Sequence, residues 1–420
     1  MTERMARRSA AALATSGEVL RLIRTGEAVT RAEIGRVTGL SRPAVALRVT
    51  ELLDSNLVVE DTEGPSTGGR PPARLRFNAS GGVVLVASLG ASRTQIAVCD
   101  LAGEVVERSE IAIDVEEGPD VVLPLLMDTW EKLLGGRPVS DVCGVGMGVP
   151  ATVEFAAGRT ESARVMASWT GVVIPPVIAA RFPVPVFLDN DVNVIAIGEH
   201  HVVYAGEADD LLFVKVSTRI GSGVIAGGRI LRGALGAAGE IGHIPVRDGG
   251  GVLCRCGTLD CLDSVASGTA ILRDLRARGK DVAGIADVVA LVRAGDAETM
   301  AVIREAARRL GEVVASAVNL LNPAVVVLGG DVAEAFQPLV SGVREVVYRR
   351  STALATRNLR IERSRLGPGA GITGCALMVL DHILAPEAVD AAIARAAGAS
   401  GGLPGSSGLG VLDKTVQGAF

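Results

Sequence analysis

Three of the six cysteines in this 420-residue chain, Cys254, Cys256 and Cys261, fall within eight residues of one another. In a large chain such a cluster indicates a metal site rather than disulfide bonds. With His243 the three thiols make a Cys3His set, the usual composition of a structural zinc site. Soft thiolates favour zinc over magnesium or calcium, and four protein ligands leave no position for a catalytic water. We therefore expect Zn2+ to fold a loop here; the alternative is a group of free buried thiols beside a core histidine.

Short apolar runs alternate with helical segments through the body of the chain, which predicts an α/β fold. Strands are predicted at 83–90, 94–100, 142–149, 184–188, 211–216 and 324–328, and a long helix at 301–321. Aromatic residues make up 3% of the chain, so the core must consist of Val, Ala, Leu and Ile. No apolar run reaches 18 residues and no apolar stretch follows the charged N-terminus. We therefore expect a cytoplasmic protein with no membrane partner.

The N-terminal segment has the pattern of a winged helix-turn-helix. Helices are predicted at 16–24, from a capping box at Thr30 and Glu33 to about Val37, and from the cap Ser41 onward. A glycine-containing turn joins the second and third helices, as in a helix-turn-helix. Two strands are predicted at 57–60 and 73–77, and the Gly- and Pro-rich loop 63–72 between them would be the wing.

This segment is mildly basic within an acidic chain. Residues 1–76 hold 12 Arg and 9 acidic residues, while the whole chain carries a net charge of −5. We predict that its partner is a double-stranded DNA operator, with the third helix in the major groove. Ser41, Arg42 and Arg48 are the candidate contacts on that helix, and Arg70 of the wing is the candidate for a minor groove. The alternative is a small helical protein-interaction domain with a solvated arginine face.

Several motifs of the body together resemble the ROK family of repressors, uncharacterised frames and sugar kinases. They are Gly144–Pro150, Leu188–Asn193, Gly239–His243, Cys254–Asp263 and Val326–Gly330. The resemblance runs from about Ser16 to about Leu384, and a winged segment before this body is typical of the repressor branch. It implies an α/β fold with a winged helix-turn-helix and a two-lobed, actin-like and sugar-kinase-like (ribonuclease H-like) domain.

The resemblance divides the chain into four parts. We expect the winged helix-turn-helix at 1–79, the first lobe at 80–190 with 366–385 returning to it, and the second lobe with its zinc loop at 191–365. The segment 386–420 is rich in Ala, Gly and Ser, and we expect it to be disordered.

The resemblance also implies a sugar site. It carries sugar contacts onto Asn190, Asp191, Glu240, His243 and Asp263, and zinc onto His243 and the three clustered cysteines. The chain departs from the family at Asp260, where Gly is usual, and at Asp263, where Glu is usual. The alternatives are an ordinary turn at Asn190 and Asp191, or a sensor that has exchanged or lost its ligand.

Kinase activity is not expected, because the phosphate side of the cleft departs from the kinase pattern. Asp191 matches the catalytic base, but Ser88 stands where the kinases have an aspartate. Arg219 replaces a glycine in the second phosphate loop, where a backbone would approach a phosphate. We predict a non-enzymatic repressor with a sugar effector, assembled as a homodimer or homotetramer. The alternatives are an ATP-dependent sugar kinase of the glucokinase type, an activator of the same architecture, and a scaffold with vestigial sites.

Overall fold

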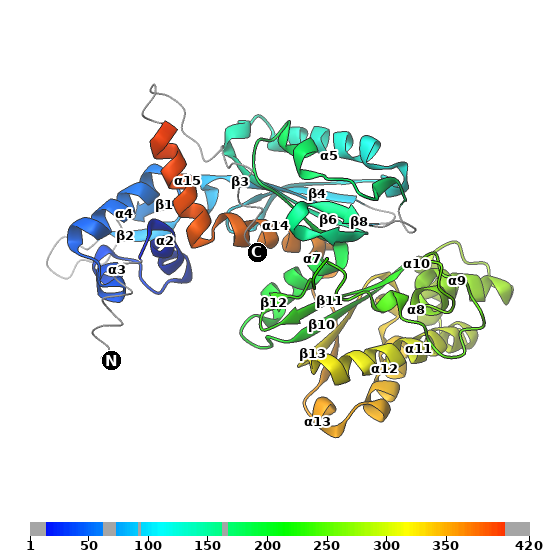
Figure 1. Ribbon diagram of the computed structural model, residues 1–420. Coiled ribbons are helices and arrows are strands. Elements are labelled where there is room, and N and C mark those ends of the chain that lie inside the picture. Colours follow the sequence, from blue (N-terminus) through cyan, green and yellow to red (C-terminus); the bar gives the residue numbers. More distant parts are fainter. Residues whose placement is uncertain (1–13, 62–72, 91–93, 162–166, 400–420) are drawn as a thin grey trace.

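The computed structural model describes residues 14–61, 73–90, 94–161 and 167–399, which form a head and two lobes (Figure 1). The head is followed by lobe 1, then by lobe 2, and the chain finally returns to lobe 1 and to the head. The order of elements agrees with the predicted α/β architecture.

The head consists of three helices and one hairpin. These are α2 (Ser16–Thr25), α3 (Arg31–Thr38), α4 (Arg42–Asp54), β1 (Val58–Asp61) and β2 (Arg74–Phe77). The predicted capping box is present: Thr30 Oγ1 accepts from the Glu33 amide at 3.2 Å, and Glu33 Oε2 accepts from the Thr30 amide at 2.9 Å. Ser41 caps α4 by accepting from the Ala44 amide. The predicted wing loop, including Arg70, lies outside the described residues.

Lobe 1 is built on a five-stranded sheet in the order β5-β4-β3-β6-β9. Its elements are β3 (Val83–Leu89), β4 (Thr94–Asp100), β5 (Val105–Ile111), α5 (Pro119–Leu134), β6 (Val142–Val149), β7 (Thr152–Glu154), β8 (Arg159–Glu161), α6 (Pro175–Ala179) and β9 (Val186–Asn190). Strands β3, β6 and β9 are parallel, whereas β4 and β5 run antiparallel to their neighbours. The buried Trp130 of α5 fixes this helix on the sheet, because its indole donates to Val86 O at 3.1 Å.

Lobe 2 repeats the topology of lobe 1, with the strand order β12-β11-β10-β13-β14. Its elements are α7 (Asp191–Glu199), β10 (Leu211–Val216), β11 (Ile220–Ala226), β12 (Arg229–Ile230), α8 (Leu262–Ala266), α9 (Gly268–Ala277), α10 (Ile285–Arg293), α11 (Ala297–Leu321), β13 (Val325–Gly329), α12 (Phe336–Arg350), α13 (Ala353–Thr356) and β14 (Arg360–Arg363). In both sheets the first strand is central and is flanked by the second and the fourth. This duplication is the architecture expected of a two-lobed, actin-like domain.

Two helices, α7 and α14 (Ala370–Ile383), pack against each other between the two sheets (Figure 1). Gly374 permits this close approach, because a Cβ there would lie 1.6 Å from Val194 O. Within the described ranges no single helix has the length and apolarity needed to cross a membrane. Only a bent pair, 367–383 with 386–398, reaches that composition, and its first helix is largely core.

The disorder expected from residue 386 is wrong for the first part of that segment. Residues Pro386–Ala399 form helix α15, which lies against α2 of the head (Figure 1). Asp390 Oδ1 accepts from the Gly17 amide at 2.8 Å, so a side chain of α15 caps α2. Val389 is buried in a core shared by the head, β3, β4 and α14. The composition of this segment does not predict the helix, because the helix is stabilised by packing on a segment that is far away in the sequence. Residues 400–420 lie outside the described residues.

Candidate functional site

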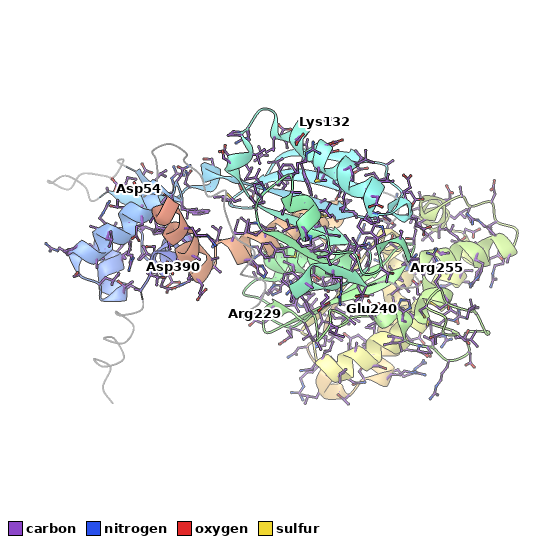
Figure 2. The ribbon with its side chains drawn as sticks, turned by 45° about the horizontal axis from the view of Figure 1, so that its top comes forward. Asp54, Lys132, Arg229, Glu240, Arg255 and Asp390 are labelled. Atoms are coloured by element: carbon purple, nitrogen blue, oxygen red, sulfur yellow. The ribbon has the colours of Figure 1, made fainter. Side chains whose placement is uncertain are left out.

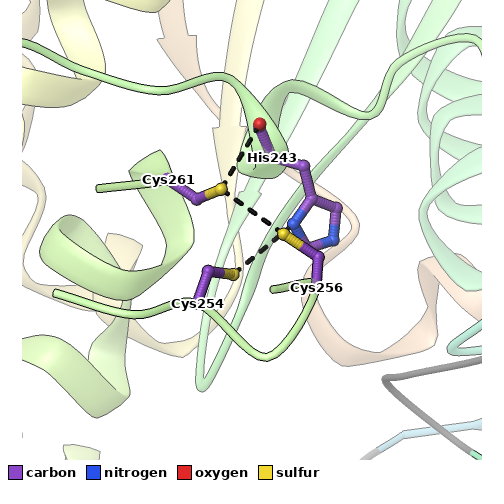
Figure 3. A group of neighbouring side chains, drawn as sticks. All are labelled: His243, Cys254, Cys256 and Cys261. Atoms are coloured by element: carbon purple, nitrogen blue, oxygen red, sulfur yellow. Dashed lines mark hydrogen bonds between the residues drawn. The ribbon is translucent and has the colours of Figure 1, made fainter. Parts of the chain in front are cut away.

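The four predicted metal ligands form one compact cluster (Figure 3). Their donor atoms all lie within 4.8 Å of one another. Cys254 Sγ is 3.7 Å from His243 Nδ1, and Cys256 Sγ is 3.5 Å from Cys261 Sγ. A tetrahedral ion with metal–sulfur bonds of ~2.3 Å places its ligand atoms ~3.7 Å apart. The donor set therefore fits a four-coordinate zinc ion.

The acid–base properties of the three thiols also bear on metal binding. Burial raises the pKa of Cys261 to about 12, and it raises the pKa of Cys254. Burial also opposes ionisation of Cys256, but hydrogen bonds from Thr258 and the neighbouring thiols lower its pKa to about 6. Three thiolates this close repel one another unless a cation lies between them. A bound metal would supply that charge and hold the loop together.

The unusual Asp260 is accommodated in the zinc loop. Its backbone has a φ of +55°, in the left-handed region that favours glycine. Its carboxylate accepts from the Val252 amide at 2.7 Å, which compensates for the strained conformation. The departure from the family pattern therefore leaves the loop geometry intact.

The predicted sugar contacts Asn190 and Asp191 lie where β9 leads into α7. Asn190 caps α7 by accepting from the Val192 amide, and its Nδ2 donates to Ala151 O at 3.0 Å. Asp191 is buried at the first turn of α7, with 9% of its side chain exposed. Both side chains thus have structural partners at the junction of β9, in lobe 1, with α7.

Glu240 and His243 reach the same region from lobe 2. Glu240 Oε1 accepts from Thr152 Oγ1 of lobe 1 at 2.8 Å, and Thr152 directly follows Ala151, the partner of Asn190. His243 Nε2 lies 3.9 Å from the other carboxylate oxygen of Glu240. These contacts link Asn190, through Ala151 and Thr152, to Glu240 and His243, and Figure 2 shows Glu240 among the side chains of the two lobes.

Asp263 lies in the first turn of α8 and accepts a hydrogen bond from the backbone. Its Oδ1 accepts from the Ile220 amide at 2.8 Å, and burial raises the pKa of its carboxyl. A glutamate at this position would extend one methylene farther. The shorter aspartate side chain supports the turn before β11 through this bond.

Two cations that pair with carboxylates at the end of β9 and the start of α7, Lys215 and Arg232, were missed by the sequence analysis. Lys215 Nζ donates to Asp191 Oδ2 at 2.6 Å, from the end of β10. Arg232 of lobe 2 donates to Asp189 Oδ2 of lobe 1 at 2.7 Å and lies over the Phe155 ring at 3.7 Å. Neither cation belongs to a recognisable motif, and only the pairing of strands with distant helices brings them to these carboxylates.

Ser88 and Arg219, on which the expectation of no kinase activity rests, lie near the end of β3 in lobe 1 and in the turn after β10 in lobe 2. Ser88 is in β3 and packs against the first turn of α14, where a Cβ on Gly371 would lie 2.2 Å from its Oγ. Arg219 is half-buried in the turn between β10 and β11. Beside it, the hydroxyl of Thr269 donates to Thr218 O at 2.8 Å, joining this turn to α9.

On the head, Ser41 and Arg42 are exposed at the first turn of α4. Arg48 already has a partner within the helix, because its guanidinium donates to the Glu51 carboxylate at 3.2 Å, one turn farther along α4. The outer face of α4 also carries Leu47, which is 56% exposed. An exposed apolar side chain on this face suits a thymine methyl group.

Three further exposed arginines of the head were not among the predicted contacts: Arg36 on α3, and Arg74 and Arg76 on β2. The signal that could have found Arg74 and Arg76 is the alternation of β2, which buries Leu75 and turns both neighbours outward.

Comparison with known proteins identifies relatives over nearly all of the chain. The ROK family model matches residues 85–382. A xylose repressor from Caldicellulosiruptor bescii is 30% identical over 387 residues, which cover 88% of this chain and 96% of the repressor. A ROK family transcriptional regulator, a homologue of the Escherichia coli MLC protein, superposes with a TM-score of 0.77 at 25% identity, covering 90% of this chain and 98% of the regulator. A ROK family glucokinase from Streptomyces griseus, solved with glucose and AMPPNP, has a TM-score of 0.60 at 26% identity and covers 71% of this chain and 99% of the kinase.

Proposed function

This chain belongs to the ROK family, and from that premise we propose that it is a DNA-binding transcriptional repressor controlled by a sugar bound between its lobes. The presence of a winged head on a complete two-lobed body is the observation that most strongly supports this function. The match to the xylose repressor covers 88% of this chain and 96% of the repressor, whereas the match to the glucokinase covers 71% of this chain. A helix-turn-helix head has no role in phosphoryl transfer. It is a usual element by which proteins recognise bases in the major groove.

In this proposal α4 enters the major groove of the operator. Ser41 and Arg42, exposed at its N-terminus, contact base edges or phosphates, and Leu47 contacts a base methyl. Arg48 and the wing residue Arg70 contact phosphates or a minor groove. Arg36, Arg74 and Arg76 add positive charge around the site. Two copies of the chain, as a homodimer or within a homotetramer, would bind paired half-sites.

The cluster of His243, Cys254, Cys256 and Cys261 would hold a structural zinc ion. Zinc would supply the positive charge that keeps the three thiolates together and would orient the imidazole toward Glu240. Glu240, Asn190, Asp191 and Asp263 would then contact the sugar. Each offers a carboxylate or amide oxygen, and sugar hydroxyls are donors for such groups.

Sugar binding would reach DNA through the lobe interface. Thr152 and Glu240 link the lobes beside the ligand contacts, and α14 continues into α15, which packs on α2 of the head. An effector that binds the two arrangements of the lobes with different affinity shifts the position of the head. A coupling of about 1–3 kcal/mol would change operator affinity roughly 5- to 150-fold.

We do not propose kinase activity, because Ser88 and Arg219 replace the carboxylate and glycine expected on the phosphate side. A coupled assay of ADP release with several sugars tests this point, and robust turnover would contradict it.

The main experiment selects genomic fragments with the full-length chain and measures their affinity by fluorescence anisotropy, with and without a pentose, a hexose and an amino sugar. We expect one fragment class to bind far more tightly than random competitor, and one sugar to release it. Equal affinity for all fragments, with or without sugar, would exclude the proposed function.

A further inference from the structure

The carboxylate of Asp191, at the first turn of α7, is held in an ion pair with Lys215 of β10. Lys215 Nζ lies 2.6 Å from Asp191 Oδ2, and the two side chains are 22% and 9% exposed. The ammonium has three donors and the carboxylate two oxygens. The pair therefore keeps both donor and acceptor capacity beyond the bond that joins it.

Lys215 occupies a position that packing would otherwise fill with an apolar side chain. The preceding residues on the same face of β10, Leu211 and Phe213, are buried against Val192 and Ala196 of α7. Lys215 is the next residue on this face, opposite the first turn of α7 where Asp191 lies. Burying an ammonium is costly unless it has a partner. Asp191, together with the ligand that Asp191 would bind, provides the partner for the Lys215 ammonium.

We infer that Lys215 is a further ligand-contacting residue and that the cleft recognises a neutral, unphosphorylated sugar; this inference rests on the proposed sugar-sensing function. A hydroxyl group is donor and acceptor at once, and the Asp191–Lys215 pair offers one group of each kind.

The charges around the pair disfavour a phosphate. Asp191 and Lys215 neutralise each other, while Glu240 adds a negative charge beside the metal cluster. Three thiolates and one zinc ion would carry a further net negative charge. The nearby cations are engaged elsewhere: Arg232 pairs with Asp189 at 2.7 Å, and Arg255 pairs with Glu116 at 3.2 Å.

Arg219 is the cation that could reverse this preference, since it is half-buried in the turn that leads to Ile220. The experiment therefore includes Arg219→Ala. Titration calorimetry of the full-length chain compares D-glucose with D-glucose 6-phosphate, and N-acetyl-D-glucosamine with its 6-phosphate; D-xylose is the pentose probe. We expect a neutral sugar to bind at least about tenfold more tightly than its phosphate.

The role of Lys215 is tested with Lys215→Met, which keeps the length of the side chain, and with Lys215→Gln, which keeps a neutral donor. We expect Lys215→Met to weaken binding of the preferred neutral sugar by about tenfold or more, and Lys215→Gln to weaken it less. Lys132→Met is the control, because Lys132 is exposed on α5, far from Glu240 (Figure 2). Zinc content and operator affinity without sugar report whether each variant is folded.

Three results would overturn the inference. The first is tighter binding of a sugar phosphate, lost in Arg219→Ala. The second is wild-type sugar affinity in a folded Lys215→Met chain. The third is the absence of binding by every sugar and phosphate tested. Only the third would also remove the proposed sensing function, so the two failures are distinguishable.

Discussion

Asp189 of lobe 1 and Arg232 of lobe 2 form an ion pair across the lobe interface, with 2.7 Å between Oδ2 and Nε. The Asp189 side chain is 2% exposed, and its other oxygen accepts from Asn193 Nδ2 at 2.8 Å. The guanidinium also lies over the ring of Phe155. This contact therefore joins the strand β9, which leads into α7, to the loop that carries Glu240.

Arg232→Met should destabilise the protein, because it leaves the carboxylate of Asp189 buried without its charged partner. Breaking a buried pair by removing one member costs about 3–5 kcal/mol. Urea unfolding measures the loss, and the double variant with Asp189→Asn should recover part of it. If Arg232→Met alone unfolded at the wild-type urea concentration, the pair would contribute nothing to the lobe interface.

Cys261→Ser should remove a ligand of the proposed zinc site. We expect purified wild-type protein to contain about one zinc ion per chain and the variant to lose it, with a lower Tm, because metal binding and folding of the loop are coupled. Cys143→Ser is the matched control, since Cys143 is a buried thiol outside the cluster. Elemental analysis that finds no metal in the wild type would contradict the site.

Arg42→Ala should weaken operator binding, because Arg42 is exposed at the first turn of α4. A lost base-edge contact costs about 1–3 kcal/mol and relaxes specificity at one base pair. Anisotropy titrations at one fixed salt concentration measure the effect. Arg137→Ala, an exposed arginine of lobe 1, should bind as the wild type does. Unchanged affinity in Arg42→Ala would argue against α4 as the reading helix.

Gly17→Ala should disturb the contact between the head and α15. The added Cβ would lie 2.1 Å from Pro386 O, so α2 must move away from α15 and the bond to Asp390 is strained. Overpacking of this kind costs about 1–3 kcal/mol. We expect a lower Tm and altered operator affinity with unchanged zinc content. Gly369→Ala is the control, since a Cβ there meets open space.

Much of the local structure could be predicted from the chain itself. The capping box at Thr30 and Glu33, the cap Ser41 and the run Val142–Val149 all reappear as predicted, because short-range hydrogen bonds and apolar runs define them. The metal cluster was predicted equally well. Its three cysteines are close in the sequence, and a short loop holds their side chains near one another.

The head, the loop with its His/Cys cluster and the α/β body were thus determined by the sequence alone, through spacing, caps and motifs. Only the tertiary structure decided that Lys215 pairs with Asp191, that Arg232 reaches Asp189, and that residues 386–399 form a helix on α2. Each of these depends on elements far apart in the chain, and α15 meets α2 across more than 370 residues. An Ala-rich segment is compatible with helix or coil, and burial against a partner decides between them.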